Sequence, residues 1–115
     1  MINGVHAIVF SPAADQVRAF FRDVLELEHV DAGGGWPIFA LPPAELAVHP
    51  DDLPHHELYL LCDDLDATLA ELRAKGVETV GPPTEASWGR RASLALPDGS
   101  ELGIYQPAHA RPGRA

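Results

Sequence analysis

Two pairs of residues in this sequence have side chains that could support chemistry or ligand binding. Glu57 and Tyr59 lie two positions apart in the apolar segment 57–62, so in a β-strand they share one face. A carboxylate on a half-buried strand finds a partner or has a raised pKa, which makes Glu57 a candidate general base; an exposed or salt-bridged carboxylate is the alternative. Trp88 and Arg90 are expected in a loop, where they can stack on and pair with a planar or anionic ligand. Trp88 alternatively covers the hydrophobic core.

The other candidate nucleophiles and ligands have weaker sequence contexts. His55 and His56 are adjacent, and neighbouring strand residues point to opposite faces, so both cannot serve one site. Cys62 ends an apolar segment and is interpreted as a small buried hydrophobe. No Ser/His/Asp signature, Walker loop or dinucleotide-binding fingerprint occurs. The glycines at 33–35 precede a predicted strand and not a helix, so they lack the context for phosphate binding.

The composition limits the class of protein. The chain has 115 residues, 46% of them hydrophobic, which predicts one folded domain. Seventeen acidic against eight basic residues give a net charge of −9, which argues against binding nucleic acid. No apolar run approaches the roughly 20 residues that a membrane span needs. A single cysteine and the absence of a secretory signal favour a cytoplasmic location.

Hydrophobic spacing predicts the elements that must position these residues. In the first half we expect a helix over 14–27, a glycine turn at 33–35, and strands over 5–10, 28–32, 36–41 and 45–49. In the second half we expect a helix from about 65 that ends at Lys75-Gly76, capped by Asp64 or Asp66. Strands are expected over 57–62, 78–80, 91–96 and 101–106, the last two joined by the turn Pro97-Asp98-Gly99.

The two halves also repeat in sequence. The segment that begins Ala40-Leu41-Pro42 returns as Ala95-Leu96-Pro97, each following a strand and helix pattern. Such self-similarity indicates a duplicated unit, here βαβββ twice, in an α+β fold whose strands curve around a groove. We expect one domain over 1–115, with modules at about 4–50 and 55–107 and a flexible tail over 108–115.

Several motifs resemble those of the vicinal oxygen chelate superfamily, the glyoxalase, bleomycin-resistance and extradiol dioxygenase group. They are Asp63-Asp64-Leu65-Asp66-Ala67, Lys75-Gly76-Val77, Leu96-Pro97-Asp98-Gly99 and Tyr105-Gln106-Pro107. The resemblance covers residues 4 to 107. It implies two βαβββ modules that form a curved, cup-shaped mixed sheet with helices outside, and a homodimer. In enzymatic members it also implies a divalent metal in the cup.

The resemblance suggests a metal site, but only two of the four family positions hold a residue that can coordinate a metal. Family ligands come from the first and last strands of each module, at positions occupied here by His6, Ala47, Glu57 and Gly103. His49 and Tyr105 lie two residues further on the same strand faces as the alanine and the glycine. His6, His49 and Glu57 would then suit Fe, Mn, Ni or Zn with open positions for a substrate. Hydrogen-bonded polar side chains that line a cavity, with no metal, are the alternative.

Two functions therefore remain open at this point. The first is a metalloenzyme acting on a small molecule with adjacent oxygens, as a lyase, isomerase or dioxygenase, with Glu57 catalytic. Its substrate site would be shaped by Tyr59, Trp88, Arg90 and Tyr105. The second is a metal-free protein, similar to the bleomycin-resistance group, that sequesters a drug or metabolite. An accessory or regulatory domain is a third possibility.

Overall fold

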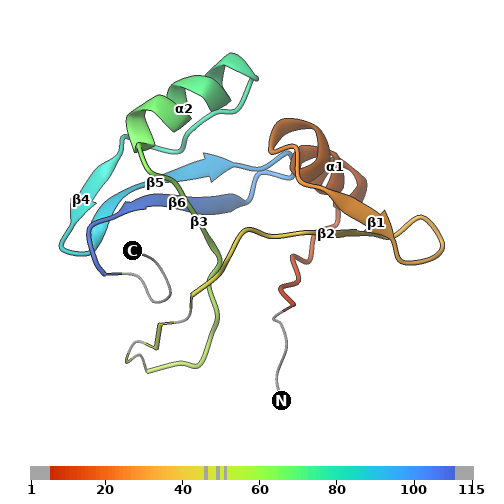
Figure 1. Cartoon of the computed structure of the whole chain (residues 1–115), viewed down its shortest axis with the longest axis horizontal. Coiled ribbons are helices and arrows are strands. Elements are labelled where there is room, and N and C mark those ends of the chain that lie inside the picture. Colours follow the sequence, from red (N-terminus) through yellow and green to blue (C-terminus); the bar gives the residue numbers. More distant parts are fainter. Residues whose placement is uncertain (1–5, 46, 49, 51, 111–115) are drawn as a thin grey trace.

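The computed structural model describes residues 6–45, 47–48, 50 and 52–110, and it has the predicted α+β architecture (Figure 1). The elements in chain order are α1 (Ala14–Ala19), the π-helical η1 (Phe20–Val24), β1 (His29–Asp31), β2 (Pro37–Phe39), β3 (Tyr59–Leu61), α2 (Leu65–Ala74), β4 (Thr84–Ala86), β5 (Gly89–Ala95) and β6 (Glu101–Pro107). Within the described ranges, no helix has the length and apolar character to cross a lipid bilayer.

The second half forms a four-stranded sheet with the order β3-β6-β5-β4. β3 runs parallel to β6, whereas β5 is antiparallel to both β6 and β4. The β5–β6 hairpin turns at Pro97-Asp98-Gly99 as predicted, because Gly99 takes a φ of 85° and the Leu96 amide donates to the Ser100 carbonyl at 2.8 Å. The resulting register places Arg91 opposite Tyr105.

Helix α2 begins and ends at the residues that the sequence indicates. The Asp64 carboxylate caps its first turn by accepting from the Ala67 amide at 3.1 Å. Past its end, Gly76 has a φ of 88° and the Val77 amide donates to the Leu72 carbonyl at 3.0 Å. These caps fix the helix against one face of the four-stranded sheet.

A single hydrophobic core joins the two halves of the chain. Residues of α1 and η1 pack with α2 and with one face of β5 and β6, so the first-half helix shares one core with the second-half sheet. The buried members are Val17, Phe20, Phe21, Leu65, Leu69, Leu72, Val77, Ala92, Leu94, Leu96, Leu102 and Ile104. Burial of this cluster is the main favourable term that holds the halves together.

Within the first half, β1 and β2 form a separate antiparallel hairpin. The predicted glycine turn is confirmed, since Gly33, Gly34 and Gly35 all have positive φ and the Trp36 amide donates to the Gly33 carbonyl at 3.2 Å. The chain then crosses from β2 to β3 through a long connection without helix or strand among its described residues (Figure 1).

Three predicted strands differ from the structure. Residues 6–10 form no strand, and neither do 45, 47 and 48, while 5, 46 and 49 lie outside the described residues. Neither segment finds a partner strand, and their apolar side chains are exposed: 88% for Phe10 and 90% for Val48. The strand predicted at 78–80 is reduced to one bridge between Thr79 and Leu94, and β4 forms after Pro82-Pro83 instead. The two sheets are accordingly separate.

Candidate ligand-binding site

Strand alternation gives the four-stranded sheet two chemically different faces. Leu94, Leu102 and Ile104 point into the core beneath α2. The intervening positions therefore face the opposite side, which we call the open face. Its residues, from the described register, are Tyr59, Arg91, Ser93, Gly103 and Tyr105. Side chains from three strands thus share a surface, and the described helices pack against the opposite face of the sheet.

Three aromatic rings form a cluster on the open face. The centroids of Tyr59 and Tyr105 are 5.6 Å apart, those of Trp88 and Tyr105 4.8 Å, and those of Tyr59 and Trp88 6.2 Å. All three pairs are edge-to-face, the arrangement that aromatic quadrupoles favour. Each ring restrains the other two, so the open face presents a rigid apolar surface.

The absence of a side chain at Gly103 allows the Tyr59 ring to take its place in this cluster. A Cβ built on Gly103 would overlap atoms Cδ1 and Cε1 of Tyr59. The phenol ring therefore lies directly against the β6 backbone, in the space where a side chain at position 103 would project. Any larger residue at 103 must displace the ring.

A pocket of about 540 Å³ adjoins the Tyr59 ring. Its walls combine apolar side chains with a few polar ones, which is the usual composition of a small-molecule site. Its lining includes Ile8, Val9, Glu57, Tyr59, Val80, Pro82, Thr84, Arg91, Ser93, Glu101 and Gly103. The segment before α1 thus supplies one wall and the open face supplies the opposite one.

Arg91 gives the pocket a positive group. Its Nε donates to the Thr84 hydroxyl at 3.3 Å, and its guanidinium carbon lies 5.8 Å from the centroid of the Trp88 ring. Burial and, secondarily, a hydrogen bond to Glu57 raise the pKa of Tyr59, against a smaller opposing effect of Arg91. Tyr59 therefore remains protonated at neutral pH and retains a hydroxyl proton to donate.

His109 extends the aromatic cluster from the segment after β6. Its Nε2 lies 3.0 Å from the Tyr105 hydroxyl, and its ring centroid is 5.9 Å from that of Tyr105. His109 Nδ1 is 2.8 Å from the Ala110 carbonyl and 3.9 Å from the Glu45 carboxylate. The Ala108 amide donates to the Trp88 carbonyl at 2.9 Å. Residues 108–110 are thus attached to the cluster, while 111–115 of the predicted tail lie outside the described residues.

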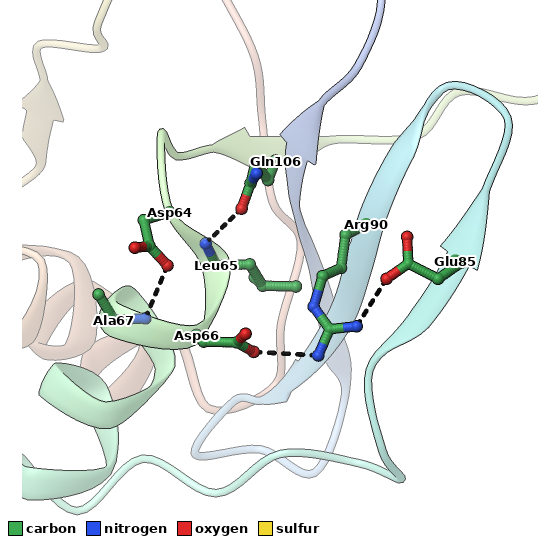
Figure 2. Close-up of polar contacts among 7 residues, drawn as sticks. All are labelled: Asp64, Leu65, Asp66, Ala67, Glu85, Arg90 and Gln106. Atoms are coloured by element: carbon green, nitrogen blue, oxygen red, sulfur yellow. Dashed lines mark hydrogen bonds and ion pairs between the residues drawn. The ribbon is translucent and has the colours of Figure 1, made fainter.

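The structure places Arg90 on the other side of the sheet from Arg91. Figure 2 shows its guanidinium between the carboxylates of Glu85 on β4 and Asp66 on α2, with nitrogen–oxygen distances of 2.7 and 3.0 Å. In the same view the Gln106 side chain accepts a hydrogen bond from the Leu65 amide at 2.9 Å. Arg90 joins the helix to the sheet edge and does not line the pocket.

The predicted metal ligands are not brought together in the described part of the chain. His6 is exposed and lies outside any strand, and Glu57 is exposed with its carboxylate 3.5 Å from the ring of His55. His49 lies outside the described residues. Among the residues that can be searched, no group of three His, Cys, Asp or Glu side chains is placed to hold a metal. The Tyr59 ring fills the space that a metal-coordinating side chain at position 103 would need.

Sequence reasoning missed Arg91 and His109 as residues of this site. The turn at Pro97-Asp98-Gly99 was recognised, and its register already pairs Arg91 with Tyr105 on one face. Counting strand positions back from that turn therefore distinguishes Arg91 from Arg90. No comparable signal exists for His109, because the sequence after Pro107 shows no periodicity.

Comparison with solved structures shows similar folds with different descriptions. TnmS3, an antibiotic-binding protein from Streptomyces sp. CB03234, is 27% identical, with 93% of this chain and 98% of that chain covered and a TM-score of 0.66. A member of the Glyoxalase/bleomycin resistance protein/dioxygenase superfamily from Sphaerobacter thermophilus DSM 20745 is 22% identical. The match covers 90% of this chain and 97% of that chain, with a TM-score of 0.64. A lactoylglutathione lyase from Agrobacterium tumefaciens is 16% identical over 90% and 92%, with a TM-score of 0.63. No curated protein sequence matches the chain.

The family itself follows from a match that spans most of the sequence. The model of the Glyoxalase/Bleomycin resistance protein/Dioxygenase superfamily matches residues 5–104, which span most of both predicted modules and the strands of the open face up to Ile104. The resemblance seen in the sequence motifs is thereby confirmed. This chain belongs to the Glyoxalase/Bleomycin resistance protein/Dioxygenase superfamily.

Proposed function

We propose that this protein binds and sequesters a planar aromatic small molecule in the pocket on the open face, without using a metal. The observation that carries the proposal is the Tyr59 ring over Gly103. Where family members have a metal-coordinating side chain, this chain has an aromatic ring that lines the pocket and can contact an aromatic molecule. The volume of about 540 Å³ lies in the range of roughly 300–1,000 Å³ that small-molecule pockets occupy. The likeness to an antibiotic-binding protein supports the same function.

The side chains at the family's metal-ligand positions also support a metal-free site. Of the four positions that family members use for metal ligands, Ala47 and Gly103 have no coordinating side chain. His6 and Glu57 leave at most two ligands there, fewer than the three or four that protein side chains supply in most zinc sites. Binding by apolar contact and hydrogen bonds needs only groups that the pocket already contains, namely the Tyr59 ring and hydroxyl and the Ser93 hydroxyl.

Trp88 fluorescence offers a direct test. In a Trp36→Phe variant Trp88 is the sole indole, and it lies within the cluster that borders the pocket. Titration with naphthalene-2-carboxamide should quench its emission in a saturable way. Tyr59→Ala should weaken this binding about tenfold or more, because a buried aromatic contact is worth on the order of 1.5 kcal/mol beyond simple area. Absence of saturable quenching in the folded protein would contradict the proposal.

The same preparation distinguishes the metalloenzyme alternative. Protein purified without a metal-binding tag should show no rise in melting temperature with Fe(II), Mn(II), Ni(II) or Zn(II), because stabilisation requires a native-state site. A metal-dependent rise that disappears in His6→Ala would favour the enzyme instead.

The protein is further proposed to act as a homodimer. Strong exposure of Ile8, Phe10 and Val48 leaves large apolar side chains in two segments that have no strand partner. Such exposure is typical of a surface that another chain covers. Because Ile8 and Val9 also line the pocket, a second copy that covers this segment would narrow the entrance to the site.

A further inference from the structure

Arg91 and Arg90 are adjacent in sequence but have opposite electrostatic surroundings. The Arg90 guanidinium is neutralised by Glu85 and Asp66 on the helix side of the sheet (Figure 2). Arg91 faces the pocket, and within the described residues it makes no ion pair. Its Nε donates to the neutral hydroxyl of Thr84, and its side chain also hydrogen-bonds to the neutral hydroxyl of Tyr59. The guanidinium therefore contacts hydroxyl groups, and no carboxylate among the described residues neutralises it.

The position of Arg91 is restrained by its neighbours. The Thr84 hydroxyl holds Nε at 3.3 Å from the adjacent strand, and the Trp88 ring lies beside the guanidinium at 5.8 Å. A guanidinium held at one nitrogen and along one face loses less rotational freedom when it binds a carboxylate. The arrangement therefore resembles a prepared anion-binding group more closely than a solvated surface arginine.

Other charged groups around the pocket oppose the binding of an anion. Glu57 and Glu101 line the same pocket, and His56 lies beside Glu57 in its wall. Glu57 is engaged by the Tyr59 hydroxyl and lies 3.5 Å from His55. The chain as a whole carries a net charge of −9. Selection of an anion must therefore come from direct contact with Arg91 and not from the overall field, which salt screens beyond about 10 Å at 0.1 M.

We propose that Arg91 makes the pocket selective for planar aromatic acids, with a ring against Tyr59 and a carboxylate on the guanidinium of Arg91. This inference rests on the proposed binding function and names its ligand class. A bidentate contact between arginine and a carboxylate is the geometry that this side chain favours. Tyr59 supplies the apolar contact with the ring, and Arg91 makes the pocket bind an acid more tightly than its neutral analogue.

The test compares 2-naphthoate with naphthalene-2-carboxamide, which differ mainly in charge. In the Trp36→Phe protein, 2-naphthoate should bind about tenfold more tightly than the amide, since charge-assisted hydrogen bonds are roughly twice as strong as neutral ones. Arg91→Gln should abolish this preference and leave amide binding nearly unchanged. Arg90→Gln is the matched control and should keep the preference, because Arg90 faces away from the pocket.

Two further variants keep the test decisive. Arg91→Met retains the hydrocarbon stem beside Trp88 and should also lose the preference, which covers the case in which Arg91→Gln fails to fold. Glu57→Gln should strengthen 2-naphthoate binding, because it removes an opposing charge from the wall. If neither compound binds to the starting protein, the proposed function itself fails. Equal binding of both compounds, or a preference retained in Arg91→Met, overturns only the role of Arg91.

Discussion

At the scale of single residues, Gly103 is the position on which the shape of the site depends. A Cβ there would overlap the Tyr59 ring, so Gly103→Ala should displace that ring and destabilise the protein by about 1–3 kcal/mol. Urea unfolding and titration with naphthalene-2-carboxamide would measure the loss of stability and of binding. Ser93→Ala, on the neighbouring strand of the same face, is the control for the stability measurement alone, because its hydroxyl belongs to the proposed binding site. Without the ring to displace, Gly103→Ala should cost almost no further stability in a Tyr59→Ala background, and binding should stay lost.

Asp98 gives the fold a defined dependence on pH. Its carboxylate accepts hydrogen bonds from the Ser100 side chain and backbone and from the Ser11 hydroxyl, which lower its pKa from 3.8 to about 2. A depressed pKa in the folded state contributes stability above pH 4 that is lost as the pH falls from about 4 towards 2. Asp98→Asn should therefore be less stable than the wild type at pH 7, and the difference should shrink towards pH 2.

Urea unfolding of both proteins between pH 7 and pH 2 provides the measurement. Asp63→Asn removes an exposed carboxylate with no hydrogen bond among the described contacts, and it controls for the change in net charge. A constant difference between wild type and Asp98→Asn across the range would show that the Ser11 and Ser100 contacts do not depend on the charge of Asp98.

At the scale of elements, the sequence predicts best where local chemistry decides the outcome. Helix α2 follows from its Asp64 cap, its leucine spacing and Gly76, and the β5–β6 hairpin follows from its turn residues. The segments at 6–10 and 45–48 have strand-like composition as well, yet residues 6–10, 45, 47 and 48 form no strand. Strand formation needs hydrogen bonds from a neighbouring segment, and composition does not reveal whether that neighbour is present.

The Asp64 cap provides a prediction for a whole element. Asp64→Ala removes the acceptor for the Ala67 amide and should cost about 1 kcal/mol of stability. Asp63→Ala, one position earlier and outside the cap, should have almost no effect. Thermal unfolding of the two variants gives the comparison, and equal melting temperatures would show that the cap adds nothing beyond the Gln106 contact to the Leu65 amide.

At the scale of the whole molecule, the site depends on contacts that no single motif encodes. Strand alternation predicts that Tyr59 and Tyr105 lie on strand faces that line the site, and β3 and β6 do lie side by side, whereas Glu57 precedes the start of β3. Arg90 was selected over Arg91 because the start of β5 was placed two residues too late, which leaves Arg90 in a loop. One position along a strand reverses the face, so an error in a strand boundary changes which arginine is expected to face the pocket.

The exposed apolar segments lead to a prediction about assembly. If a second copy covers residues 6–10, sedimentation at micromolar concentration should give twice the 12.4 kDa mass of one chain. Phe10→Asp places a charge on the most exposed large apolar side chain of that segment and should shift the protein towards monomer. Glu71→Ala, on the exposed side of α2, should leave the mass unchanged. A wild-type chain that sediments as a monomer would mean that these side chains stay in water, and the pocket would then be completed by one chain alone.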